Sequence, residues 1–143
     1  MGPREEARTE ETPKVGCVSS QGVTFDTGML VALERRKQSA WEIYRRVYER
    51  KAPITVPSPV IGEWWRGRTD IRDAIRLSVH VEPLTDAIAR LAGEAMAKVR
   101  SATTIDAFVM ASAVLRGDVV YSSDIEDLER LRAFFPSVRL LSI

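Results

Sequence analysis

The stretch TIDAFVMASAVLRGDVVYS, residues 104–122, decides the fold. Apolar side chains occupy every side of a helix over Thr104–Leu115, and this pattern predicts a helix buried in the centre of the protein. Gly117 is typical of the residue that ends a helix, and Val119-Val120-Tyr121 after it predicts a short strand. Asp106, in the first turn, is the only charged residue of the helix, and a buried carboxylate is costly unless a cation or hydrogen-bond donors neutralise it.

Short apolar runs and helical patterns keep alternating in both directions from this stretch. Further strands are predicted at Val23–Phe25, Ile54–Val56 and Val138–Leu141, and Val79–Leu84 is predicted to be a short strand or an extended link. Further helices are predicted at Met29–Arg35, Trp41–Arg50, Pro59–Arg66, Ile71–Leu77, Thr85–Val99 and Ile125–Phe134. Strands that alternate with helices form parallel sheets that are covered on both faces. The predicted fold class is therefore three-layer α/β, with a central parallel sheet of four to five strands flanked by helices.

Composition limits the remaining possibilities. Residues 1–20 are polar and have no apolar period, so we expect a disordered extension before a single domain over residues 21–143. Cys17 is the only cysteine and His80 the only histidine, so carboxylates are the main residues left to bind a catalytic metal. No apolar run is long enough to span a membrane and no signal peptide is present, so we expect a cytoplasmic protein that binds no membrane.

Acidic residues follow three of the predicted strands. Asp26 directly follows the first strand, Glu63 lies in the short helix after Ile54–Val56, and Asp124 comes two serines after Tyr121. Because parallel strands end at one edge of the sheet, where open sheets bind ligands, we expect these acids to converge there with Asp106.

Each of these acids also has a purely structural interpretation. Asp26, Asp106 and Asp124 precede or open helical patterns, so each one alone fits an N-cap or a first-turn residue that stabilises the helix dipole. Glu63 is poorly placed as a cap, so capping alone does not account for the four acids together.

Charge is unevenly distributed along the chain. Residues 35–76 contain 11 Lys/Arg and 5 Asp/Glu, a local charge of +6, although the whole chain carries only +1. A basic stretch of this kind suits a phosphate-backbone partner. The arginines of solvated helix faces would give the same count, so charge alone does not decide between the two.

The segments that carry the acids resemble, in order, the four motifs of the PIN domain family of nucleases, and of its VapC toxins in particular. They are VTFDTGML with Asp26, PSPVIGEWWRG with Glu63, TTIDAFVMASA with Asp106, and VVYSSDIEDL with Asp124. The resemblance runs from about Val23 to the end of the chain, and four motifs in order are far more specific than any one alone.

This resemblance implies a metal-dependent endoribonuclease, the toxin half of a toxin–antitoxin pair, that hydrolyses RNA phosphodiesters with Mg²⁺ or Mn²⁺. It implies that Asp26, Glu63, Asp106 and Asp124 hold the metal, and that a cognate antitoxin and a second copy of the chain are partners. Around these acids we expect supporting roles for Thr27, Ser123 and Asp127, and RNA contacts from Arg66, Arg68 and Arg72.

Other interpretations of the same residues are weaker. Asp26-Thr27-Gly28 matches the D-T-G of aspartic proteases, but those enzymes are all-β and need a second D-T-G, which is missing here. A phosphatase with an aspartate nucleophile would need an acid where Gly28 stands. An inactive PIN fold that binds RNA or serves assembly remains the alternative from another class.

The stripe of Trp41, Tyr44, Val47 and Tyr48 fits core packing better than a partner-binding face.

Overall fold

The computed structural model describes residues 21–143, and the predicted extension over residues 1–20 lies outside the described residues. A sheet of five parallel strands has the order β3-β2-β1-β4-β5. The strands are β1 (Val23–Phe25), β2 (Ile54–Pro57), β3 (His80–Glu82), β4 (Val119–Ser122) and β5 (Leu140–Ser142). The helices are α2 (Thr27–Glu34), α3 (Gln38–Glu49), α4 (Ser58–Trp64), α5 (Asp70–Leu77), α6 (Asp86–Lys98), α7 (Thr104–Arg116) and α8 (Ile125–Leu131).

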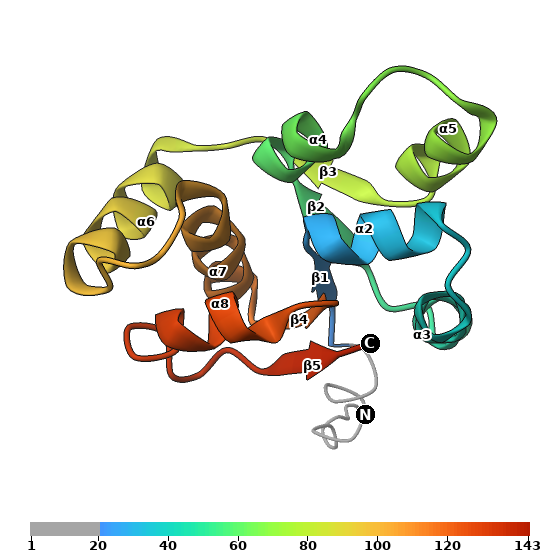
Figure 1. The fold of residues 1–143 in the computed structure, drawn as a ribbon. Coiled ribbons are helices and arrows are strands. Elements are labelled where there is room, and N and C mark those ends of the chain that lie inside the picture. Colours follow the sequence, from blue (N-terminus) through green and yellow to red (C-terminus); the bar gives the residue numbers. More distant parts are fainter. Residues whose placement is uncertain (1–20) are drawn as a thin grey trace, which may run out of the picture.

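The helices cover both faces of the sheet, which confirms the predicted three-layer α/β class. The chain moves from β1 outward to β2 and β3, then returns to β4 and β5 on the other side of β1. Right-handed crossovers therefore place α2 to α5 on one face and α6 to α8 on the other. Figure 1 shows α2, α3 and α5 on one side of the sheet and α6 and α7 on the other.

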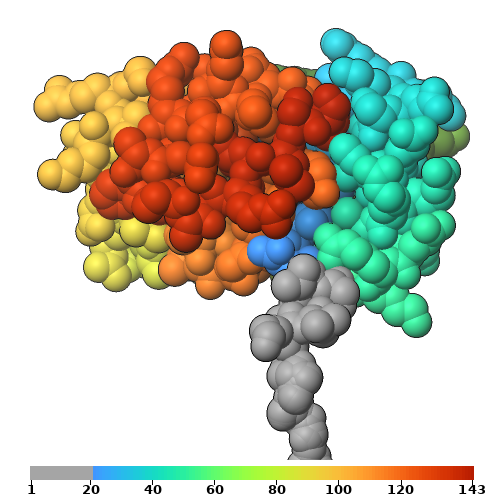
Figure 2. All heavy atoms as spheres, turned by 90° about the horizontal axis from the view of Figure 1, so that it is seen from below, coloured from blue at the N-terminus to red at the C-terminus, as the bar shows by residue number. Residues whose placement is uncertain are grey.

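The core lies between these layers and is centred on α7, as its sequence predicts. Ala107, Val109, Met110, Ala111 and Ala113 of α7 are fully buried, and Gly117 ends the helix with a left-handed φ of 75°. Seen from below, the start of the described chain lies between the C-terminal elements and the segment around α3 (Figure 2). Among the described residues, no helix has the length and apolar character needed to cross a bilayer.

Predicted and observed elements differ mainly at their ends. The helix predicted from Met29 starts at Thr27, because the Asp26 carboxylate caps it. The last helix ends at Leu131 instead of Phe134, and the last strand runs over Leu140–Ser142. The aromatic stripe of α3 is only partly in the core: Trp41 and Tyr44 are half-buried, whereas Tyr48 is 66% exposed.

Candidate metal centre at the carboxyl edge of the sheet

The candidate site lies where the strand order reverses. β1 pairs with β2 on one side and with β4 on the other, and the chain leaves β1 and β4 in opposite directions across the sheet. At such a switch point the two connections diverge and leave a crevice beyond the strand ends. Asp26 follows β1 here and Ser122 ends β4, and the Asp26 amide lies 3.5 Å from the Tyr121 carbonyl oxygen to which it donates.

Asp26 is the most enclosed acid of the site. The residue is only 8% exposed, and its Oδ1 accepts a hydrogen bond of 2.9 Å from the Met29 amide at the start of α2. Burial raises its pKa to about 6, although hydrogen bonds from the Ser122 hydroxyl and the Met29 amide act in the opposite direction. The nearby Asp106 carboxylate adds to the increase. Asp26 is therefore both a helix cap and a carboxylate with an unusually high pKa.

Asp106 projects from the first turn of α7 and is half-buried. Its amide donates to Thr103 Oγ1 at 3.2 Å, while the Thr103 hydroxyl in turn stabilises the Asp106 carboxylate. Burial raises the pKa of Asp106 despite that hydrogen bond, and the charges of Asp127, Glu63 and Asp124 raise it further. Asp106 thus lies in the field of acids from α4 and from the start of α8.

The remaining acids are exposed and lie around Asp106. Glu63 of α4 accepts a hydrogen bond of 2.5 Å from the Thr27 hydroxyl of α2. Asp124 caps α8, with its Oδ1 3.3 Å from the Glu126 amide, so the capping role predicted for this residue coexists with its place in the cluster. Asp127 forms an ion pair of 3.1 Å with Arg130.

The chemistry of this cluster suits a hard divalent cation. Among the described residues, the ion pairs leave Asp26, Glu63, Asp106 and Asp124 without a Lys or Arg partner. Uncompensated carboxylates are a donor set for Mg²⁺ or Mn²⁺, and two of these, Asp26 and Asp106, have raised pKa values. Within residues 21–143, no three His, Cys, Asp or Glu side chains already stand in a geometry that would close around one ion. Mg²⁺ keeps part of its water shell between itself and its ligands, so these acids need not all contact the ion directly.

Sequence analysis singled out Ser123 and missed Ser122. The Ser122 side chain is only 1% exposed, donates its hydroxyl hydrogen to the Asp26 carboxylate, and accepts the Asp124 amide at 3.0 Å. It therefore ties β1 and β4 together at the site. The strand pattern contained this information, because Ser122 comes two residues after the buried Val120 of β4 and therefore faces the same side of the sheet. Ser123 is exposed, and its Oγ lies against Gly28 of α2.

The three arginines predicted to contact RNA have different surroundings. Arg66 is exposed and, among residues 21–143, forms no ion pair. Arg68 forms an ion pair with Asp73, with its Nε 2.5 Å from the Asp73 carboxylate. Arg72 is largely enclosed: it forms an ion pair of 2.8 Å with Glu34 and donates to the Gly67 carbonyl at 2.9 Å. Of the three, only Arg66 is open to a new anionic partner without breaking an existing contact.

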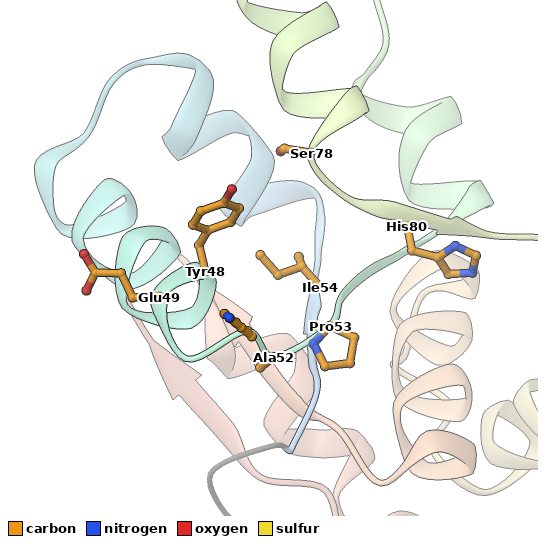
Figure 3. A pocket seen from close by; sticks show the side chains of 8 residues that line it. Tyr48, Glu49, Ala52, Pro53, Ile54, Ser78 and His80 are labelled. Atoms are coloured by element: carbon orange, nitrogen blue, oxygen red, sulfur yellow. The ribbon is translucent and has the colours of Figure 1, made fainter.

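A groove of about 510 Å³ lies elsewhere on the molecule, between the end of α3 and the starts of β2 and β3. Figure 3 shows Tyr48, Pro53, Ile54 and His80 around it. Because Ile54 and His80 begin their strands, this groove is at the amino edge of the sheet, opposite the carboxylates. Its lining is mainly apolar, and it takes no part in the candidate metal centre.

The model of the PIN domain family matches residues 23–133, a span that contains all four carboxylates. No match was found among curated protein sequences.

Several solved structures share the fold. VapBC2 from Rickettsia felis, bound to a DNA fragment of its promoter, has a TM-score of 0.69 at 12% identity, over 85% of this chain and 98% of that one. DNA-bound VapBC from Salmonella typhimurium has a TM-score of 0.65 at 15% identity, with the same two coverages of 85% and 98%. Mycobacterium tuberculosis VapC20, a sarcin–ricin loop cleaving toxin, has a TM-score of 0.57 at 24% identity, over 73% of this chain and 92% of that one. At these identities the likeness concerns the fold.

Proposed function

This chain belongs to the PIN domain family, and from that premise we propose that it is a metal-dependent endoribonuclease, the toxin of a toxin–antitoxin pair in the cytoplasm. One observation carries the proposal: Asp26, Glu63, Asp106 and Asp124 gather at the switch point of the sheet, and no described cation neutralises them. A structural role would favour paired acids, because an unpaired buried charge destabilises the fold.

In the proposed mechanism these four carboxylates hold Mg²⁺ or Mn²⁺, directly or through water. When bound, the metal would polarise the phosphoryl oxygens and lower the pKa of the attacking water. Ser122 fixes the Asp26 carboxylate, and Thr27 fixes Glu63, so that both acids face the crevice. The Thr103 hydroxyl holds Asp106 in the same way. We assign Asp127 and Ser123 supporting positions at the rim.

The toxin assignment is supported by the identity of the similar structures. Those from Rickettsia felis and Salmonella typhimurium are VapBC complexes, and VapC20 is a toxin that cleaves the sarcin–ricin loop. By analogy, we propose a cognate antitoxin that covers the site and a homodimer as the assembled form. RNA contacts are assigned first to Arg66, which is open, and then to Arg68 and Arg72, whose ion pairs would have to rearrange.

The proposal is tested by incubating the purified chain with mixed cellular RNA in Mg²⁺, in Mn²⁺ and in a chelator. We expect cleavage in either metal and none in the chelator. Asp86→Asn is a matched control, because Asp86 is an exposed carboxylate on α6 whose ion pair within residues 21–143 is with Arg90. It should cleave as the wild type does, whereas Asp106→Asn should not. RNA binding without cleavage in any metal would instead favour an inactive RNA-binding fold.

A further inference from the structure

A second surface feature adjoins the carboxylates on the outer side of α2. Residues one helical turn apart, Gly28, Val31, Ala32 and Arg35, line a shallow groove of about 200 Å³ together with Lys37 and Ser123. The groove contains no acidic lining residue. One of its ends is at the metal centre and the other carries two cations.

The cationic end is built by the turn that follows α2. Arg36 has a left-handed φ of 59°, the Lys37 amide donates to the Ala32 carbonyl at 2.9 Å, and the Arg36 amide donates to the Leu33 carbonyl at 3.0 Å. These two bonds form a Schellman motif, which fixes the direction in which the chain leaves the helix. The motif turns Lys37 back toward the face of α2 that carries Arg35, so both cations lie on the groove.

Both cations are available for a ligand. Arg35 and Lys37 are exposed, and in residues 21–143 neither forms an ion pair. Glu34, the acid next to Arg35 in the chain, is engaged elsewhere, by Arg72 at 2.8 Å and by the Trp64 indole N–H at 2.9 Å. This differs from Arg68 and Arg72, which already have carboxylate partners.

At the other end of the groove, a glycine lets a serine hydroxyl lie close to α2. A Cβ on Gly28 would lie 2.3 Å from Ser123 Oγ and 3.5 Å from Asp26 Oδ1. The missing side chain therefore leaves room for the Ser123 hydroxyl beside the metal centre. From Gly28 to Arg35 the helix rises by about 10 Å, at 1.5 Å per residue. A strand whose scissile phosphate lies at the carboxylates would carry a neighbouring phosphate within reach of Arg35 and Lys37.

We propose that this groove binds a phosphodiester of the RNA strand that flanks the scissile one, held by Arg35 and Lys37. The inference rests on the proposed nuclease function and adds a subsite to it. The ligand is a flexible single strand, because the groove has a volume of only about 200 Å³ and its cations suit a backbone phosphate. The groove extends the site along α2 and uses cations other than the α4–α5 arginines that the sequence first indicated.

The test compares two double variants of equal charge. Arg35→Gln/Lys37→Gln removes both groove cations, and Arg90→Gln/Arg139→Gln removes two exposed cations on α6 and before β5. Binding of a mixed-sequence single-stranded RNA is measured by fluorescence anisotropy in the Asp106→Asn background, over a series of salt concentrations. The groove variant should bind about tenfold more weakly, with a salt slope smaller by about 1.4, which is two contacts at about 0.7 each. The control should lose little of either.

Substrates with one neutral methylphosphonate linkage make the test specific. The effect of Arg35→Gln/Lys37→Gln should disappear for the single linkage that the groove contacts and persist for all others, as in a double-mutant cycle. Equal RNA binding by the two double variants would contradict the proposed phosphate subsite. The same result is expected if the groove binds an acidic protein instead of RNA. If wild-type protein never cleaves RNA but the groove variant still loses binding, the nuclease function fails and the subsite stands.

Discussion

Two groups of acidic side chains lie against the same sheet, and they differ in how their charge is compensated. In the closed cluster, Glu82 of β3 and Asp118 before β4 share Arg116 at the end of α7. In the open cluster, Asp26, Glu63, Asp106 and Asp124 surround the switch point with no described cation between them. The acids of the closed cluster are paired with a cation, whereas those of the open cluster are not.

The contacts of the closed cluster are complete. Arg116 lies 2.5 Å from Glu82 and 2.9 Å from Asp118, and its third nitrogen donates to Thr24 Oγ1 at 2.6 Å. Thr24 donates in turn to Asp118 at 2.8 Å, and Ser112 donates to Glu82 at 2.5 Å. Burial alone would raise the pKa of Glu82, but the hydrogen bonds from Arg116 and Ser112 outweigh it and leave this pKa below its ordinary value.

The opposite directions of the pKa shifts express the difference between the clusters. Glu82 has a lowered pKa because its partners stabilise the charged form, whereas Asp26 and Asp106 have raised pKa values because theirs do not outweigh burial. Burial disfavours the charged form of Asp26 and Asp106, and a bound cation would stabilise that form. The contrast therefore predicts that substitutions in the two clusters change different properties.

The largest expected effect is on catalysis, from Asp106→Asn. Removing one carboxylate from the open cluster should lower RNA cleavage by at least about 100-fold, because the metal loses a ligand. Stability without metal should not fall, since the substitution removes a half-buried charge and leaves the backbone hydrogen bond to Thr103 Oγ1 in place. Cleavage rates and thermal unfolding of the two proteins check this. Unimpaired cleavage by the variant would remove the distinction between the clusters.

The next effect is on folding, from Arg116→Met. This change leaves Glu82 and Asp118 next to each other without a cation, and Asp118 is only 7% exposed. The free energy of unfolding, measured in urea, should fall by about 3 kcal/mol. At temperatures where the variant is folded, its metal binding should match that of the wild type. A variant as stable as the wild type would show that the closed cluster does not stabilise the fold.

A third effect follows from the raised pKa of Asp26. Between its ordinary value of 3.8 and its folded value of about 6, the folded protein holds a proton that the unfolded chain has lost. The contribution of this group to stability is therefore complete below about pH 4 and is lost as the pH rises through about 6.

Asp26→Asn tests this dependence, because Asn keeps an oxygen to cap Met29 but does not titrate. Without metal, the variant should gain stability over the wild type as the pH rises from about 4 to 7, by at most about 3 kcal/mol. Unfolding free energies across that pH range measure the difference. Adding Mg²⁺ at neutral pH should stabilise the wild type and not the variant. A difference that does not change with pH would contradict the raised pKa.

Much of this architecture could be predicted from sequence, because most strands are short apolar runs and the helices between them have recognisable apolar patterns. The buried α7 and the acids after β1, β2 and β4 depend only on the order of elements, which local patterns specify well. What sequence did not provide is the pairing of side chains across elements. That Glu34 engages Arg72 and leaves Arg35 open depends on how α2 packs against α5, and no local pattern contains that information.

One serine in each cluster also makes a contact that the sequence could not predict. Ser122 and Ser123 are adjacent and chemically identical, and only the last residue of β4 faces Asp26. Its counterpart in the closed cluster is Ser112, which is fully buried, donates to Glu82 and accepts from Arg116 at 2.6 Å. Both serines bridge a carboxylate to another group, so the same truncation in each gives the finest comparison between the clusters.

The smallest expected effect is therefore the difference between Ser122→Ala and Ser112→Ala. Ser112→Ala should cost about 1 kcal/mol and leave the pKa of Glu82 low, because Arg116 still holds that carboxylate. Ser122→Ala removes the side-chain hydrogen bond that lowers the pKa of Asp26, and no cation takes its place. In the metal-free protein the pKa of Asp26 should rise above its value of about 6, which NMR titration of the side-chain carboxyl carbon can follow. An unchanged pKa of Asp26 would mean that the open cluster is compensated by a group other than Ser122, and the contrast between the two clusters would then be one of degree.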